Sequence, residues 1–188
     1  MTSGAPFDDV LAAARANAGW AFARIHKIFA PPVTAYVRMQ GLRDADDVVN
    51  EVFLAAFRGL ASFEGDETRF RRWLFTIAHH RVVDARRAHA RSPRTEELDA
   101  AADRAAPGRP RWSPEDAAVA ACEEDRIRAV LGRLSPEQRE VIVLRVLADL
   151  PVEQVAKIVG KRPGAVRALQ HRALATLRRL LAVEPVTF

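Results

Sequence analysis

Apolar residues recur at intervals of three and four positions along both halves of the chain, which is the spacing of one face of an α-helix. In the segment 44–60 the apolar positions are Val48, Val49, Val52, Phe53, Phe57 and Leu60. The polar residues left outside that face are Asp46, Asp47, Asn50 and Glu51. The pattern predicts a helix over 44–60 with a polar, largely acidic outer surface.

Two more segments before position 92 show helical spacing. The first has apolar positions on both sides of a proline pair, at Phe22, Ile25, Ile28, Phe29, Tyr36, Val37 and Leu42. Because proline lacks an amide hydrogen and crowds the preceding turn, we expect Pro31 and Pro32 to interrupt this helix. The second has an apolar stripe at Phe70, Trp73, Leu74, Ile77 and Ala78. No segment alternates apolar and polar residues long enough to indicate a strand, so the expected fold class is all-α.

The segment 92–113 separates these helices from a second helical region. It contains three prolines, and its only large apolar residues are Leu98 and Trp112. Such a segment cannot bury enough apolar surface to offset the entropy lost on ordering. The pairs Ser113-Pro114 and Ser135-Pro136 each have the form of a helix N-cap followed by proline at the first helical position. We therefore predict two small helical domains, at 1–91 and 114–188, joined by a flexible linker at 92–113.

Residues 152–171 have the spacing of a helix-turn-helix motif. Ala156 is small where two helices must approach closely, and Gly160 supplies a left-handed turn residue. The inner stripe of the second helix is Val166, Leu169, Ala173, Leu177 and Leu180. Basic and imidazole side chains lie at the turn and on the outer face of the second helix, where DNA would be read: Lys161, Arg162, Arg167, His171 and Arg172.

The net charge of +5 conceals two basic blocks. Residues 68–94 carry eight arginines and one acid, and residues 157–179 carry seven Lys and Arg and no acid. Each block has a net charge of +7, so the remaining chain sums to −9. A solvated helix face normally mixes both signs, which makes an ordinary hairpin with a charged surface a poor explanation of the second block. The two blocks indicate nucleic-acid binding.

Aromatic residues accompany the arginines of the first block, at Phe70, Trp73 and Phe75. Mixed aromatic and basic surfaces suit single-stranded or unstacked bases, although Phe70 and Trp73 also fit a buried stripe. His79 and His80 have no cysteine nearby and no spaced histidine partner, so metal ligation by them is not expected. The acids of 44–60 lack an accompanying nucleophile or phosphate loop, so no catalytic residue and no cofactor is expected.

The single cysteine, Cys122, excludes an internal disulfide, and no apolar run is long enough to span a membrane. Asp8 and Asp9 lie where a signal peptide would carry basic residues. We expect a cytoplasmic protein.

The segments DADDVVNEVFLAAFRGLASFEG and FRRWLFTIAHHRVVDARR resemble region 2 of the sigma-70 family of bacterial RNA polymerase initiation factors. The segment LSPEQREVIVLRVLADLPVEQVAKIVGKRPGAVRALQHRALATLRRL resembles region 4 of the same family. The chain is short and a linker stands in place of region 3, which is similar to the extracytoplasmic-function (ECF) group. The resemblance implies a region 2 helical bundle at 1–91, a region 4 helix-turn-helix domain at 114–188, and a non-enzymatic role in promoter-specific transcription initiation.

By position, the resemblance assigns three sets of residues. Docking on the β′ clamp helices of core RNA polymerase falls to Asp46, Asp47, Asn50 and Glu51. Opening and binding of the minus-ten element falls to Arg69, Arg71, Arg72, His80, Arg81, Asp84 and Arg87, with Glu64 to Arg69 as a loop around an extruded base. Reading of the minus-thirty-five element falls to Lys161, Arg162, Arg167, His171 and Arg172, with this domain seated on the β flap.

Two positions depart from the family pattern. His80 stands where the family often has Asn, and Ala165 stands where it often has Thr, so the base preference does not transfer. The resemblance also implies an anti-sigma factor as partner, and no small-molecule substrate. Two other readings stay open at this level: a stand-alone dimeric helix-turn-helix regulator, and a metal-dependent nuclease built on the acidic helix.

Overall fold

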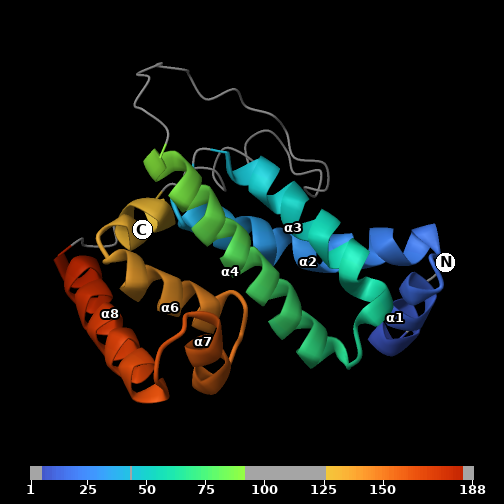
Figure 1. The fold of residues 1–188 in the computed structure, drawn as a ribbon. Coiled ribbons are helices and arrows are strands. Elements are labelled where there is room, and N and C mark those ends of the chain that lie inside the picture. The colour runs from blue at the N-terminus through green and yellow to red at the C-terminus, as the bar shows by residue number, and fades with distance from the viewer. Residues whose placement is uncertain (1–5, 43, 92–125, 184–188) are drawn as a thin grey trace, which may run out of the picture.

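The computed structural model describes residues 6–42, 44–91 and 126–183. Over these ranges the regular structure is α-helix with one short 3-10 turn, and no strand occurs in them (Figure 1). The expected all-α class is confirmed. The segment 92–113, the Ser113-Pro114 helix start and Cys122 lie outside the described residues.

Four helices make the N-terminal unit: α1 (Phe7–Arg15), α2 (Gly19–Met39), α3 (Ala45–Gly59) and α4 (Glu67–Arg91). A 3-10 turn, η1 (Leu60–Ser62), follows α3. The long helix α4 crosses the bundle and packs against α2 and α3 (Figure 1). The apolar faces read from the sequence all point inward, since Val52, Phe53 and Phe70 are among the buried residues. Burial of such a side chain stabilises the fold by about 1.5–3 kcal/mol.

The helix α2 is continuous through both prolines, so the expected interruption at Pro31 and Pro32 is wrong. A proline inside a helix costs about 3 kcal/mol, because one hydrogen bond is lost and the ring crowds the preceding turn. Phe29, Val33 and Tyr36 lie on either side of the prolines on one face of α2 and are fully buried. The burial of that face offsets the cost, which local sequence rules do not weigh.

The C-terminal unit contains a helical segment at 126–132, then α6 (Pro136–Val146), α7 (Val152–Ile158) and α8 (Pro163–Val183). The predicted cap at Ser135 is confirmed as a full capping box. The Ser135 hydroxyl accepts a hydrogen bond from the backbone amide of Gln138, and the Gln138 side-chain oxygen accepts one from the backbone amide of Ser135. This exchange satisfies two amides that the first helical turn leaves without partners.

The two units pack against each other, which the sequence did not indicate. Helix α6 contacts α2, and α7 contacts α4. The buried core is continuous across the contact, because Val141 and Leu144 of α6 belong to the same apolar cluster as Tyr36 and Phe75. The helix-turn-helix therefore lies beside the basic helix α4 (Figure 1).

Candidate nucleic-acid interface

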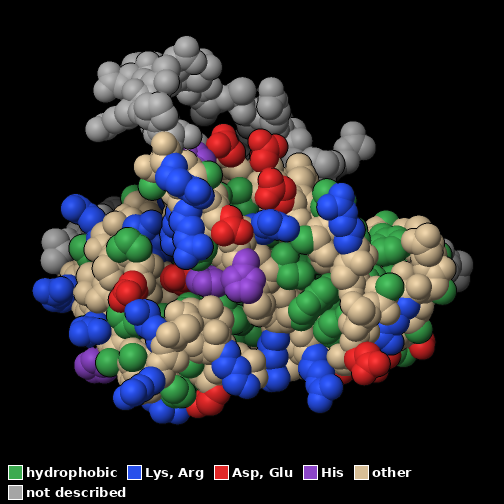
Figure 2. All heavy atoms as spheres, in the orientation of Figure 1, with side chains coloured by type: hydrophobic (Ala, Val, Ile, Leu, Met, Phe, Trp, Pro, Cys, Tyr) green, Lys and Arg blue, Asp and Glu red, His purple; other side chains and the backbone are tan. Residues whose placement is uncertain are grey.

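The outer face of α3 is an exposed acidic surface, as its pattern predicts. Asp46, Asp47, Asn50 and Glu51 are all exposed, and acidic side chains gather over α3 in Figure 2. Asp46 pairs with Arg38 at 3.2 Å, and Glu51 lies 4.0 Å from Arg81. The same face also exposes an apolar side chain that the sequence reasoning missed, Leu54, at 51%. Leu54 follows Glu51 by three positions, so helical spacing alone places it on the same face as the acids.

The loop before α4 is fixed by a side-chain cap. The Asp66 carboxylate accepts from the backbone amide of Arg69 at 2.8 Å. Gly65 has a φ of 148° and an added Cβ there would lie 2.7 Å from the Arg69 side chain, so the loop closes tightly. This places Arg69 exposed at the start of α4.

The residues predicted to bind the minus-ten element spread over α4 with different degrees of access. His80, Asp84 and Arg87 are exposed, and Arg81 is half-buried. Arg71 and Arg72 are half-buried as well. The Arg71 guanidinium lies 5.4 Å from the centre of the Phe29 ring and 3.4 Å from the Glu67 carboxylate, so it packs on the core while keeping its charge at the surface.

The aromatic residues of the first basic block belong to the core. Phe70 and Phe75 are fully buried, and Trp73 packs on Phe63 with ring centres 5.0 Å apart. Helix α3 approaches Trp73 so closely that a Cβ on Gly59 would lie 2.9 Å from its ring. Burial of Phe70 confirms its place on the predicted buried stripe, and Phe75 is too deeply buried for its ring to receive a base.

The helix-turn-helix has the expected geometry. Gly160 adopts a φ of +64°, the left-handed conformation that glycine tolerates best. Arg162, Arg167, His171 and Arg172 are exposed around the turn and along α8. Lys161 pairs with Glu137 at 2.7 Å.

Arg167 pairs with Glu153 of α7 at 2.8 Å, and both side chains are exposed. Exposed pairs are worth at most about 1 kcal/mol. The Arg167 guanidinium therefore remains available to a phosphate.

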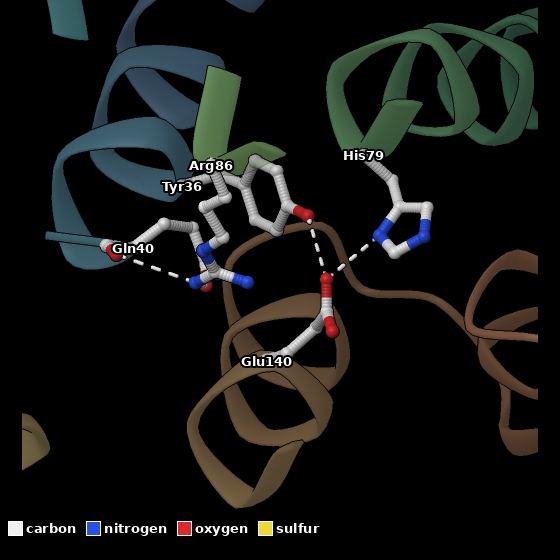
Figure 3. A network of polar contacts seen from close by, with 5 residues as sticks. All are labelled: Tyr36, Gln40, His79, Arg86 and Glu140. Carbon is white, nitrogen blue, oxygen red and sulfur yellow. Dashed lines mark hydrogen bonds and ion pairs between the residues drawn. The ribbon is translucent and has the colours of Figure 1, made fainter. Parts of the chain in front are cut away.

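A polar network joins the two units through residues that the sequence reasoning did not assign to any site (Figure 3). Glu140 of α6 accepts a hydrogen bond from the Tyr36 hydroxyl at 3.3 Å. Its Oε1 also lies 2.7 Å from Nδ1 of His79. Arg86 of α4 donates to the Gln40 side chain at 2.7 Å and to the Gln40 backbone carbonyl at 3.3 Å. One signal was available: a tyrosine in an apolar stripe usually has a partner for its hydroxyl.

The charge of Glu140 follows from these neighbours. Burial by itself would raise the pKa of this carboxyl, but the hydrogen bond and charge of His79, the charge of Arg86 and the Tyr36 hydroxyl outweigh it. The pKa of Glu140 is lowered as a result. Burial and the Glu140 carboxylate raise the pKa of Tyr36 well above its ordinary value, so its hydroxyl stays a donor. Because the carboxylate has no proton, Nδ1 of His79 is the donor to it.

A cleft of about 670 Å³ lies where the helix-turn-helix meets α4. On the α4 side it is lined by His79, His80, Arg81, Asp84 and Arg87, and on the other side by Ile158, Val159 and Gly160. Four of the residues expected to bind the minus-ten element thus face the end of α7.

The described residues contain no group of three or more His, Cys, Asp or Glu side chains placed to hold a metal ion. This removes the geometric support for a metal-dependent nuclease over the part of the chain that the structure covers. Among the same residues, no helix combines the length and the apolar character needed to cross a membrane.

Comparison with known proteins places both units in one family. Residues 28–92 match Sigma-70 region 2, and residues 124–177 match Sigma-70, region 4. The chain is 34% identical to the ECF RNA polymerase sigma factor BldN of Streptomyces coelicolor, over 89% of this chain and 63% of that protein. It is 36% identical to the ECF RNA polymerase sigma factor SigD of Mycobacterium tuberculosis, over 93% of this chain and 84% of that protein.

A solved structure of CnrH in complex with the cytosolic domain of CnrY matches with a TM-score of 0.64 and 26% identity, over 94% of this chain and 97% of that one. The chain belongs to the sigma-70 family of RNA polymerase sigma factors. Its similarity is to the ECF group, whose members direct promoter-specific transcription initiation.

Proposed function

We propose that this chain binds core RNA polymerase through α3 and opens and reads promoter DNA through α4 and α8. The observation that carries the proposal is the separation of charge on the structure: one exposed acidic face on α3, and exposed basic faces on α4 and on α8. A protein that held only duplex DNA would have no use for an acidic face beside a basic one.

The α3 face suits a protein partner. The exposed Leu54 follows Asn50 and Glu51 by one helical turn, so the surface offers an apolar side chain next to polar and acidic ones. We assign to it the β′ clamp helices. The exposed Val146 at the end of α6 gives the C-terminal unit an apolar contact of its own, which we assign to the β flap.

The α4 residues divide into backbone and base contacts. Arg69, Arg71, Arg72 and Arg87 are assigned to phosphates of the opened strand. His80, Arg81 and Asp84 face the cleft and are assigned to bases of the minus-ten element. Because Phe70 and Phe75 are buried, stacking on these rings does not contribute to opening.

In the C-terminal unit, α8 is assigned to the major groove of the minus-thirty-five element. Arg167, His171 and Arg172 project from its exposed face, and arginine reads guanine through two hydrogen bonds. Lys161 and Arg162 at the turn are assigned to phosphates, where they fix the register of the helix.

The cellular compartment and a further protein partner follow from the proposed role in transcription initiation. A factor that works with RNA polymerase on chromosomal promoters acts in the cytoplasm and needs no catalytic group of its own. Solved structures with this fold include the sigma factor RpoE in complex with the anti-sigma factor NepR from Bartonella quintana. We propose that an anti-sigma factor regulates this chain as well.

Run-off transcription with bacterial core polymerase and a promoter library, followed by sequencing of start sites, tests the role. Specific transcripts that require the chain are expected. Asp47→Asn should lower the affinity for core at least tenfold, whereas Asp9→Asn, which removes an exposed negative charge on α1, should not. A chain that fails to elute with core at low salt, or that binds duplex DNA as a dimer without polymerase, would overturn the proposal in favour of a stand-alone regulator.

A further inference from the structure

A smaller cavity lies where α1 faces the loop before α4. Its volume is about 280 Å³. Two elements line it: α1 with Asp8, Leu11 and Arg15, and the loop with Glu64, Gly65 and Asp66. Pockets for drug-sized ligands measure about 300–1,000 Å³, so this cavity suits a ligand of the size of one nucleobase. The family resemblance places the loop around an extruded base, but it assigns no role to α1.

Both walls of this cavity have fixed positions. On the α1 side, Leu11 is only 1% exposed, and α1 packs against η1, which leads into the loop. On the loop side, the Asp66 carboxylate holds the backbone amide of Arg69, and Gly65 approaches the Arg69 side chain closely. The cavity is therefore built before any ligand arrives, which lowers the entropy lost on binding.

Arg15 presents a flat cation at this cavity. It lies exposed in the last turn of α1, with its guanidinium carbon 5.9 Å from the centre of the Phe63 ring. That ring is held in turn by Trp73 and Phe70, at centre distances of 5.0 and 5.5 Å. Unstacked bases stack on arginine planes as well as on aromatic rings. Arg15 thus offers the accessible stacking surface that the buried ring of Phe70 does not.

The carboxylates of the lining favour some bases over others. Asp8 and Glu64 are exposed at the cavity, one on each wall. An ionised carboxylate accepts hydrogen bonds and donates none. The amino groups of adenine and cytosine donate to such an acceptor, whereas thymine presents a carbonyl oxygen and a methyl group in the same place. The lining therefore suits a base that carries an amino group.

We propose that Arg15 of α1 is a specificity-determining residue of the minus-ten contact. It covers the face of one extruded base, while Asp8 and Glu64 select a base with an amino group over thymine. The inference rests on the proposed function for the DNA, and it adds α1 and a base preference to that function. The arginines assigned to phosphates cannot supply this preference, because the backbone is the same for every sequence.

Two substitutions separate stacking from charge at this position. Arg15→Ala removes the guanidinium, and Arg15→Lys keeps the positive charge without the plane. The matched control is Arg24→Ala, which removes an exposed positive charge on α2 and does not line the cavity. Circular dichroism and the thermal midpoint establish that each chain is folded.

Binding is measured with the chain in complex with core polymerase. The probes are fluorescent single-stranded oligonucleotides that carry the minus-ten element identified by start-site sequencing. Arg15→Ala should weaken binding about five- to tenfold, which is the range expected for one lost base stack. Arg15→Lys should recover only part of this loss, and Arg24→Ala should stay within about twofold of wild type.

An abasic scan of the oligonucleotide identifies the base. At one position the abasic site should weaken binding by wild type but not by Arg15→Ala, because the stacking partner is already absent. At every other position the two losses should add. A loss that is additive at all positions, or full rescue by Arg15→Lys, would overturn the stacking role.

Replacing the base at that position tests the carboxylates. Wild type should prefer an amino-bearing base over thymine by about fivefold or more. The double variant Asp8→Asn, Glu64→Gln places amide donors in the cavity, so it should lose most of this preference. A preference for thymine, or one that is unchanged in the double variant, would refute the selection.

Failure of this inference differs from failure of the proposed function. If the wild-type complex directs no specific transcript, the proposed function itself is wrong and the base contact falls with it. If specific transcripts appear but Arg15→Ala behaves like Arg24→Ala, the function stands and only the role of α1 is overturned.

Discussion

The Nδ1 atom of His79 lies 2.7 Å from Oε1 of Glu140, although 61 residues separate the two in the sequence. His79 belongs to the unit that matches region 2, and Glu140 to the unit that matches region 4. The hydrogen bond therefore crosses from one DNA-binding unit of the factor to the other. The contact between the units therefore contains a carboxylate as well as apolar side chains.

Acid should weaken this contact. The pKa of Glu140 is lowered by His79, Arg86 and Tyr36 in the folded protein, against an ordinary value of 4.5. A carboxyl of this kind adds stability above its ordinary pKa, and that stability is lost as the pH falls through the lowered value. Small-angle X-ray scattering from pH 6 down to pH 3 should show expansion only below about pH 4.5 in wild type.

The same titration with Glu140→Ala provides the control. This variant lacks the group, so its scattering should change little with pH until global acid unfolding. Circular dichroism at each pH separates expansion from unfolding. Equal pH profiles for the two chains would contradict the assignment to Glu140.

Gly160 should resist substitution for a backbone reason. Its φ of +64° strains any residue with a Cβ, although no atom lies within 4 Å of the place such a Cβ would occupy. Gly160→Ala should lower the free energy of unfolding by about 1–2 kcal/mol. Chemical denaturation of the full chain measures this.

Gly164 supplies a matched comparison four residues later. It lies inside α8, its φ is not in the positive range, and an added Cβ again meets nothing. Gly164→Ala should raise the free energy of unfolding by up to about 1 kcal/mol, because alanine is the better helix former. Opposite signs for the two substitutions are the expected result, and equal signs would refute the conformational explanation.

Pro31→Ala should stabilise the protein. Pro31 is exposed inside the continuous helix α2, so alanine restores an amide hydrogen and removes the ring without opening a cavity. The gain of about 3 kcal/mol is reduced by up to about 1 kcal/mol through the greater freedom of the unfolded chain. The midpoint of urea unfolding should rise accordingly. Thr34→Ala on the same helix is the comparison and should change stability by less than about 1 kcal/mol.

Arg167→Ala should weaken use of the minus-thirty-five element. The side chain is exposed on α8 and is held only by a surface pair with Glu153, so its charge is available to DNA. Loss of one base contact should cost about 1–3 kcal/mol in promoter binding by the polymerase complex. If the contact is to phosphate instead, the salt slope should fall by about 0.9 with little change in sequence preference.

Arg24→Ala on α2 is the control for Arg167→Ala, since it removes another exposed positive charge, from the N-terminal unit. It should leave promoter binding within about twofold of wild type. Filter binding or fluorescence anisotropy at three salt concentrations gives both slope and affinity. A matching loss in the two variants would point to net charge rather than to the recognition helix.

Local chemistry determined most of the elements. The spacing of Val48, Val52 and Phe53 fixed which face of α3 is buried, and the acids opposite them are exposed as a direct consequence. Ser135 before Pro136 marked the start of α6, and Gly160 marked the turn of the helix-turn-helix. Each of these signals acts within a few residues, so the sequence alone carries it.

Tertiary packing decided what local chemistry could not. Helix α2 passes through Pro31 and Pro32 because burial of Phe29 and Tyr36 on one continuous face stabilises the fold enough to offset the cost of the prolines. The partner of Glu140 cannot be read from its neighbours in the chain, because Tyr36 lies 104 residues away. Periodicity reports which side of a helix is apolar, but only the folded chain decides which other helix covers it. The family and the helices that carry the proposed DNA contacts thus follow from the sequence by itself, whereas the contact between the two units exists only in three dimensions.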